Sequence, residues 1–199
     1  EVAAGRYVAG WLAYEASPAF EPAFAAHAPG EFPLVWLASY SVPHPAPAMA
    51  AEESHRAAWR LGITPEEYTR AFAAIRARIA AGETYQVNYT FPLDAPAPRD
   101  AWALFQALYA AQPVPHACYL DTGRWQVLSL SPELFFRLDA GVLETRPMKG
   151  TRPRGPYAVP DAAAREALAT SAKEQAENVM ITDMLRNDMA RVAAPGSVE

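Results

Sequence analysis

The chain has 199 residues, of which 51% are hydrophobic and 20% are charged. This balance is enough for a sizeable core, and it excludes disorder, a coiled coil and collagen. The net charge of −5 argues against a nucleic-acid partner and against attachment to an anionic membrane, because both need a basic surface. One cysteine cannot form an internal disulfide, and no run of about 18 apolar residues occurs. We therefore expect a protein of a reducing compartment, the cytoplasm, without a membrane span.

The two ends and the basic residues carry further information. The chain opens at Glu1 rather than at Met and stops at Glu199, just as a new segment begins, so we expect a piece of a longer polypeptide. Only two of the 17 basic residues are lysines, Lys149 and Lys173. In such an arginine-rich background each lysine is informative, because arginine serves as a surface charge but not as a nucleophile.

The clearest element is a helix over 65–81. Thr64 fits its N-cap, Glu67 completes a capping box, and Gly82 fits a C-terminal stop. Large apolar residues recur at helical spacing and predict one apolar face, made of Tyr68, Phe72, Ile75 and Ile79. A second helix is predicted over 99–112, and its inward face carries Trp102, Phe105 and Leu108.

Strand-like segments surround these helices. Aromatic, β-branched and apolar residues predict strands over 5–14, 34–40, 84–93, 116–121, 124–130, 134–138 and 142–146. Thr122-Gly123 and Asp139-Ala140-Gly141 predict two hairpin turns. A last helix begins after Ser171 and runs to about Val192. Because strands and helices come partly in blocks, we expect an α+β fold with mixed or antiparallel sheets and packed helices.

A loop rich in proline and glycine spans 146–156 and concentrates four cations, which are Arg146, Lys149, Arg152 and Arg154. Gly150 would let a ligand approach the main chain closely. One interpretation is a solvated loop whose charges point outward. The other is an anion site in which Lys149 is a nucleophile or base. That role needs desolvation or cationic neighbours that favour a neutral amine, and the three arginines are the candidates.

Glu133 follows Ser131-Pro132 at a turn between two apolar strands and precedes Leu134-Phe135-Phe136. A carboxyl group bordered by such an apolar wall suits a general acid. The alternative is an ordinary turn acid that faces water.

Glu177 lies on a predicted helix face together with apolar residues, namely Met180, Ile181 and Met184. An acid on such a face must be paired, protonated or bound to a metal. Lys173, four residues earlier, is one possible partner. Mg²⁺ is the other, because it prefers oxygen ligands. The four histidines have no metal-ligand spacing, so we expect no zinc site.

Several of these motifs occur together in one known family. Residues 85–90, 131–133, 145–152, 176–180 and 183–188 resemble, in order and approximate spacing, motifs of the chorismate-utilising enzymes. That family includes anthranilate synthase component I, aminodeoxychorismate synthase component I, and isochorismate and salicylate synthases. Residues 10–15 are similar to an upstream family segment. The resemblance covers most of the chain and implies the β-α-α-β sandwich of anthranilate synthase component I. It also implies that residues 1–199 are a partial chorismate-binding domain, clipped at its N-terminus and lacking its C-terminal portion.

Two positions distinguish the members of this family. Anthranilate enzymes typically carry alanine where this chain has Lys149, whereas aminodeoxychorismate enzymes carry a lysine that is thought to attack the substrate ring at C2. Members that add water typically have a lysine near the position of Gln86, so Gln86 implies ammonia as the nucleophile. The resemblance therefore implies amination of chorismate to 4-amino-4-deoxychorismate, toward 4-aminobenzoate and folate.

The same resemblance implies roles for individual residues. Lys149 would form the covalent bond and Glu133 would protonate the departing 4-hydroxyl group. Glu177 would hold Mg²⁺ in part, and the substrate site would be lined by Asn88, Gly150 and Thr151. A glutamine amidotransferase subunit or domain would supply the ammonia. Because family members carry further site groups in the missing portion, we expect the isolated chain to be inactive. Two alternatives stay open, namely anthranilate synthase component I and a non-catalytic binding module of the family.

Overall fold

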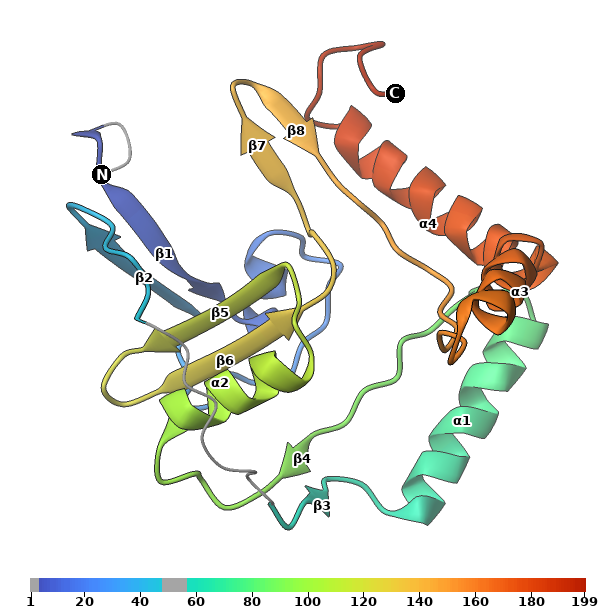
Figure 1. The fold of residues 1–199 in the computed structure, drawn as a ribbon. Coiled ribbons are helices and arrows are strands. Elements are labelled where there is room, and N and C mark those ends of the chain that lie inside the picture. Colours follow the sequence, from blue (N-terminus) through green and yellow to red (C-terminus); the bar gives the residue numbers. More distant parts are fainter. Residues whose placement is uncertain (1–3, 48–56) are drawn as a thin grey trace. The chain divides into compact units, whose positions relative to one another are not determined.

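The computed structural model describes residues 4–47 and 57–199, which form two compact units (Figure 1). Unit 1 comprises the described residues of Glu1–Gln112 together with Tyr119–Leu128, and unit 2 comprises Pro113–Cys118 with Ser129–Glu199. The hairpin of β5 (His116–Asp121) and β6 (Gln126–Ser131) contributes residues to both units. No helix in the described ranges is long and apolar enough to cross a membrane.

Unit 1 begins with an antiparallel pair of strands, β1 (Tyr7–Leu12) and β2 (Val35–Tyr40). The short helix η2 (Tyr14–Ala19) lies between these two strands in the chain. The ring of Trp11 stacks on Trp36 across the pair, with ring centroids 4.9 Å apart. Its indole N–H donates to the carbonyl of Pro33 at 3.1 Å, so both the apolar and the polar part of this side chain are used. The predicted strands at 5–14 and 34–40 are confirmed, with shorter bounds.

Helix α1 (Pro65–Ala80) begins and ends as the sequence predicts. The hydroxyl of Thr64 accepts the N–H of Glu67 at 3.2 Å, and the Glu67 carboxylate accepts the N–H of Thr64 at 2.9 Å. At the other end Gly82 has a φ of +75°, and the N–H groups of Gly82 and Glu83 bond to the carbonyls of Ile79 and Arg78. These bonds form a Schellman motif, which satisfies carbonyls at the end of the helix.

The apolar face of α1 forms at the predicted spacing, but no residue of this helix is buried. Tyr68 contacts aromatic neighbours, with ring centroids 6.0 Å from Tyr89 and 6.1 Å from Phe91. All three rings are nevertheless exposed, because the described residues of unit 1 place no further layer over them.

The predicted strand at 84–93 is wrong for most of its length. Only β4 (Leu93–Asp94) is a strand, and it pairs with β3 (Arg60–Leu61). Residues 84–92 run between α1 and β4 without a sheet partner in the described chain (Figure 1). A strand needs a neighbour for its backbone hydrogen bonds, and strand-like side chains alone do not supply one.

Helix α2 (Ala101–Ala111) is capped by Asp100, whose carboxylate accepts the N–H of Ala103 at 3.0 Å. Phe105 is buried and lies 5.8 Å, between ring centroids, from Tyr119 of β5. Leu108 is exposed, so its predicted inward orientation is wrong.

Unit 2 contains the hairpin of β7 (Arg137–Asp139) and β8 (Val142–Glu144). Its two-residue turn, Ala140-Gly141, has φ values of +46° and +81°, as a type I′ turn requires. Helix α4 (Ala172–Ala190) begins after the predicted cap, Ser171. Helix α3 (Ala158–Ala169) is a finding that the sequence analysis did not predict.

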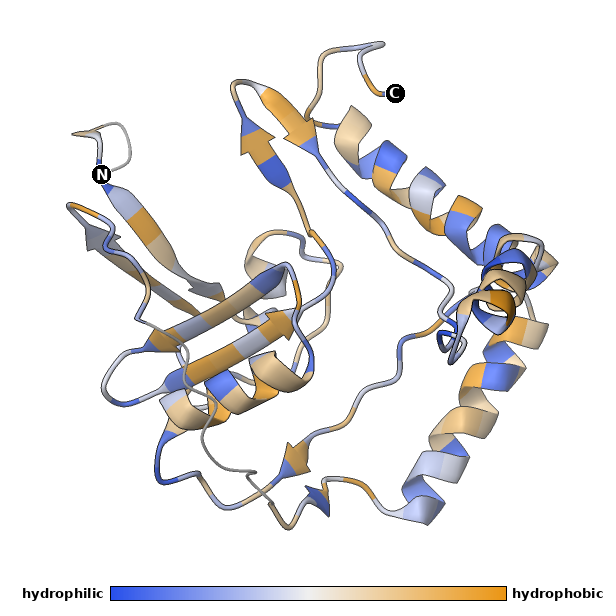
Figure 2. Ribbon diagram, in the orientation of Figure 1, coloured by the Kyte–Doolittle hydropathy of each residue, from blue (hydrophilic) through white to orange (hydrophobic). Residues whose placement is uncertain are grey.

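The described chain therefore combines helices with two-stranded antiparallel sheets, and this agrees with the expected α+β class. The sizeable core expected from the composition is not observed within the described ranges, where the buried hydrophobic residues are Ala16, Ala101, Phe105 and Val114. Hydrophobic positions are instead spread over exposed elements, such as the orange positions of β7 and β8 in Figure 2. Leu138 of β7, for example, is 65% exposed.

Candidate active site

The six residues that the sequence analysis assigned to a site fall into the two units. Asn88 belongs to unit 1, where it is exposed on the unpaired segment 84–92. The other five belong to unit 2, and they are Glu133, Lys149, Gly150, Thr151 and Glu177. The contacts that follow are those within unit 2, except where unit 1 is named.

The clearest of these contacts joins the Glu133 turn to the Lys149 loop, which we define as residues 145–157 between β8 and α3. The Glu133 carboxylate accepts the backbone N–H of Met148 at 2.9 Å. Ser131 stabilises the turn, because its hydroxyl donates to the carbonyl of Glu133 at 3.1 Å and accepts its N–H at 3.4 Å. Since Met148 directly precedes Lys149, the hydrogen bond holds the Glu133 carboxylate beside the segment that carries Lys149.

Of the two interpretations of Glu133, the described chain shows the turn acid that faces water and not the apolar wall. Phe135 is 82% exposed, and Phe136 is exposed as well. Their rings contact each other edge to face at 5.2 Å. Glu133 is itself exposed, because nothing in the described part of unit 2 covers these two rings.

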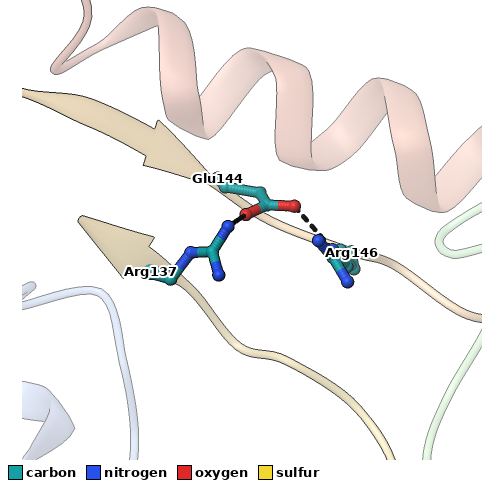
Figure 3. Close-up of polar contacts among 3 residues, drawn as sticks. All are labelled: Arg137, Glu144 and Arg146. Atoms are coloured by element: carbon teal, nitrogen blue, oxygen red, sulfur yellow. Dashed lines mark hydrogen bonds and ion pairs between the residues drawn. The ribbon is translucent and has the colours of Figure 1, made fainter. Parts of the chain in front are cut away.

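Lys149 is half-buried, and the described residues show no hydrogen bond or ion pair for its amine. Arg146, one of its expected cationic neighbours, donates from Nε to Oε1 of Glu144 at 2.5 Å. Arg137 of β7 pairs with the other oxygen of the same carboxylate (Figure 3). The hydrogen bond from Arg146 holds the pKa of Glu144 below its ordinary value, and the charge of Arg137 adds to this effect.

Arg154, the second expected neighbour, is also paired. Its Nε donates to Oδ1 of Asp161 at 2.5 Å and its Nη2 donates to Oδ2 at 2.6 Å. The N–H of Gly155 adds a third bond to Oδ1 at 3.0 Å. The hydrogen bond from Arg154 lowers the pKa of Asp161, and the N–H of Gly155 lowers it further. Of the three candidate arginines, the described residues leave only Arg152 without a carboxylate partner.

Gly150 brings the Lys149 loop against α3 and α4. Its φ is +82°, a conformation that favours glycine. A Cβ atom at this position would lie 2.9 Å from Oε2 of Glu174 and 3.3 Å from Cδ1 of Leu168. The close approach expected at Gly150 is therefore made by the first turn of α4, and Glu177 follows one turn later on the same helix.

Glu177 shows the ion pair that was one of its two interpretations, because Nζ of Lys173 lies 3.8 Å from its Oε1. The side chain of Glu177 is 31% exposed. Its carboxylate is the kind of oxygen donor that Mg²⁺ prefers, so the chemistry of this residue fits the metal. Among residues 4–47 and 57–199, however, no three acidic, histidine or cysteine side chains converge on one point. His55, one of the four histidines for which no zinc site is expected, lies outside the described residues.

In unit 1, Gln86 has an unusual surrounding. Its side-chain oxygen, Oε1, is buried and has no hydrogen-bond partner among the described residues. Its backbone carbonyl accepts the hydroxyl of Thr84 at 3.1 Å. A buried acceptor without a partner is costly, so a group that donates to it is expected in the functional state.

Sequence reasoning missed the acids that hold the Lys149 loop, Glu144 and Asp161. A signal existed for Glu144, since a predicted hairpin places it opposite Arg137 and it lies two residues before Arg146. Asp161 had no such signal, because it lies in the first turn of the helix that was not predicted.

Comparison with known proteins adds family information to this geometry. The family model described as chorismate binding enzyme matches residues 37–199. Aminodeoxychorismate synthase component 1 of Klebsiella aerogenes is 41% identical over 165 residues, which cover 83% of this chain and 36% of that protein. The Escherichia coli protein of the same name is 40% identical over 71% of the chain and 31% of its own length. Anthranilate synthase component 1 of Thermus thermophilus is 37% identical over 86% of the chain and 38% of its own length. The chain thus spans about a third of the length of these relatives.

Proposed function

The chain belongs to the family of chorismate-binding enzymes, and from that premise we propose that the polypeptide containing it aminates chorismate to 4-amino-4-deoxychorismate. The observation that carries the proposal is the hydrogen bond of 2.9 Å from Met148 N–H to the Glu133 carboxylate, one residue before Lys149. It keeps a carboxyl group near the only lysine of the loop, as a reaction with one nucleophile and one general acid needs.

In the proposed first step the neutral amine of Lys149 attacks C2 of the substrate ring. Both ring double bonds shift by one position, and the bond between C4 and its hydroxyl oxygen breaks. Glu133 donates a proton to that oxygen, so water leaves. The enzyme then carries the ring on Lys149, and Glu133 is a carboxylate.

In the second step ammonia attacks C4, the double bonds return and the bond between C2 and Lys149 breaks. The new C4 ammonium group returns a proton to Glu133, so the enzyme regains its starting state. The sum is chorismate and ammonia giving 4-amino-4-deoxychorismate and water. A covalent intermediate divides one difficult displacement into two easier ones.

We propose that Asn88, Gly150 and Thr151 line the substrate site. Gly150 supports this role, because it directly follows Lys149 and its φ of +82° sets the backbone conformation there. Thr151 follows it and is exposed, so its hydroxyl is available to a ligand in the described chain. Asn88 offers a side-chain amide on the unpaired segment that also carries Gln86.

Glu177 would supply one oxygen ligand to Mg²⁺, which polarises a bound oxygen of the substrate when it is present. To bind metal the carboxylate must exchange Lys173 for the cation. At 3.8 Å, with Lys173 77% exposed, this pair is weak enough to be exchanged.

We further propose that residues 1–199 are part of a larger chorismate-binding domain with the β-α-α-β sandwich of the family. Two observations support this, namely the exposed apolar faces of α1 and of the β7–β8 hairpin, and the fact that the match spans only 36% of the length of the Klebsiella aerogenes relative. The name component 1 of the relatives indicates a second component in those proteins. For this chain we propose a glutamine amidotransferase subunit or domain that supplies ammonia.

The test uses the full-length polypeptide with chorismate, Mg²⁺ and ammonium, and it identifies the product by chromatography. We expect 4-amino-4-deoxychorismate, and we expect Lys149→Ala to lower the rate about 100-fold or more. Lys173→Ala is the matched control, because it removes the other lysine of the chain, and it should keep most of the activity.

Three results would contradict the proposal. An unchanged rate for Lys149→Ala would show that Lys149 is not the nucleophile. Release of anthranilate and pyruvate would assign the polypeptide to anthranilate synthase component 1. Calorimetry without any Mg²⁺-dependent binding of chorismate would indicate a non-catalytic module.

A further inference from the structure

We infer that Arg154, Gly155 and Asp161 form a clamp that fixes the C-terminal end of the Lys149 loop, so that Arg154 and Asp161 position Lys149 for the reaction. The inference rests on the proposed function for its catalytic consequence. The clamp itself lies within unit 2, so its existence can be tested separately.

The clamp is a two-point contact. Both oxygens of Asp161 accept N–H groups of Arg154, at 2.5 and 2.6 Å, so the planes of the guanidinium and carboxylate groups are fixed relative to each other. A lysine in place of Arg154 would keep the charge but only one of the two directed bonds. Asp161 is itself held in place, because its backbone N–H donates to the carbonyl of Tyr157 in the first turn of α3.

Gly155 adds a backbone hydrogen bond and a close approach to the clamp. Its N–H donates to the same carboxylate at 3.0 Å. A Cβ atom on Gly155 would lie 2.2 Å from the backbone nitrogen of Asp161 and 2.5 Å from the carbonyl carbon of Pro160. No side chain fits in that space, so the loop backbone is seated directly on α3.

The clamp restricts Lys149 because a second anchor lies close to it in the chain. Met148 is held by Glu133 and Gly155 is held by Asp161, so six residues connect the anchors. One of those six, Pro153, has a fixed φ, and Gly150 lies against Leu168 and Glu174. With both ends fixed, few backbone conformations remain for Lys149. Release of the Asp161 end would leave only the Glu133 bond and the Gly150 contact.

The ion pair between Arg154 and Asp161 should contribute little to the overall stability of the fold. The side chain of Arg154 is 87% exposed, and exposed ion pairs add little to the free energy of unfolding. A positioning role therefore predicts a specific pattern, in which turnover falls and loop motion rises while the melting temperature barely changes. A merely structural role predicts instead that the melting temperature falls and that hydrogen exchange rises throughout unit 2.

The experiment compares Arg154→Ala, Arg154→Lys and Asp161→Asn in the full-length polypeptide. It measures kcat and KM for chorismate with ammonium as nitrogen source, the melting temperature, and hydrogen exchange of the Met148 amide. For Arg154→Ala we expect kcat to fall about 10- to 100-fold, since small displacements of reacting groups are costly, with KM changed less than about twofold. We expect the Met148 amide to exchange about tenfold faster. Arg154→Lys should recover part of both effects.

Arg165→Ala is the matched control, because it removes a nearby arginine, on α3, for which the described residues show no partner. It should leave all four measurements unchanged. The double variant Arg154→Ala with Asp161→Asn should be no worse than either of these single variants, because the two residues act as a pair.

The outcomes separate the two proposals. If the wild-type polypeptide forms no aminated product, the proposed function fails, and exchange of the Met148 amide still decides whether the clamp exists. If wild type is active and the Arg154 and Asp161 variants keep its kcat and its exchange rate, the clamp is overturned. A fall in melting temperature of several degrees, with faster exchange throughout unit 2, would also overturn it, since that result indicates a structural role only.

Discussion

Gly150, directly after Lys149, has a backbone conformation that favours glycine. Its φ of +82° is a conformation that residues with a side chain adopt only at a cost. An added Cβ would also meet the Glu174 carboxylate at 2.9 Å, so a substitution must move that side chain. The position next to the proposed nucleophile thus combines a backbone requirement with a steric one.

Replacement of Gly150 by alanine is expected to lower the free energy of unfolding by about 1–2 kcal/mol, because an L-residue is strained at positive φ. Urea unfolding of the full-length polypeptide measures this change. Gly123→Ala is the first control, since Gly123 has a φ of +80° and nothing within 4 Å of its added Cβ. Gly30→Ala is the second, because Gly30 has open space and no positive φ. The explanation fails if Gly150→Ala costs no more than Gly30→Ala.

The carboxyl group of Asp161 is expected to make the stability of the fold depend on pH. Arg154 and Gly155 lower its pKa, so the folded state favours the carboxylate form. A group with a lowered pKa stabilises the fold above its unfolded pKa of about 3.9, and the effect is lost as the pH falls through the folded pKa. At pH 7 the contribution is complete.

We expect the small difference in melting temperature between wild type and Asp161→Asn to be constant from about pH 7 to pH 5 and to shrink as the pH falls through the lowered pKa of Asp161. Asparagine does not titrate, so the difference isolates this carboxyl group from Glu144, whose pKa is lowered as well. Differential scanning calorimetry across this range is the measurement. A difference that persists unchanged in strong acid would assign the effect to lost hydrogen bonds rather than to charge.

At the scale of elements, the sequence predicted those parts whose ends are determined locally. Helix α1 needs only Thr64, Glu67 and Gly82 to define its two ends, and all three lie within the predicted segment or next to it. The β7–β8 turn needs only two residues with positive φ. Such signals are complete in a short stretch of sequence and can be read without knowing the rest of the fold.

Other elements depend on partners far away in the chain, and there the sequence was insufficient. Residues 84–92 have strand-like side chains but no sheet neighbour among the described residues. Helix α3 was missed because Pro160 discourages a helix prediction, although proline in a first turn removes no hydrogen bond. The consequence for the candidate site was that Asp161 went unnoticed, whereas Glu133 and Lys149 were predicted from their motifs.

The capping box of α1 gives a test at this scale. Thr64→Ala removes an acceptor from the N–H of Glu67 and is expected to cost about 1 kcal/mol in the free energy of unfolding. Thr69→Ala on the same helix is the control, since the hydroxyl of Thr69 only donates to a carbonyl one turn earlier, which does not strengthen a helix. Unfolding in urea, followed by circular dichroism, compares the two. Equal losses would show that the cap does not define the start of α1.

At the scale of the whole molecule, the feature to explain is the number of large apolar side chains without cover. In unit 1 they include Tyr68 and Phe72 of α1, and in unit 2 they include Phe135, Leu138 and Val142. Soluble proteins rarely expose contiguous apolar patches of this kind unless another surface binds there. Our proposal of a larger domain assigns that cover to further residues of the same polypeptide.

Leu138 distinguishes a covered face from a free one. It is 65% exposed in the described chain, so Leu138→Ser should change the stability of the isolated 199-residue chain little. In the full-length polypeptide, where we expect further residues over β7, the same change should cost about 1.5–3 kcal/mol, as loss of a buried leucine does. Binding of the dye ANS gives a second measurement, because it reports exposed apolar surface. The isolated chain should bind ANS strongly and the full-length polypeptide weakly. Equal dye binding, together with equal effects of Leu138→Ser in both forms, would mean that these faces stay open in the complete protein and that the larger domain does not cover them.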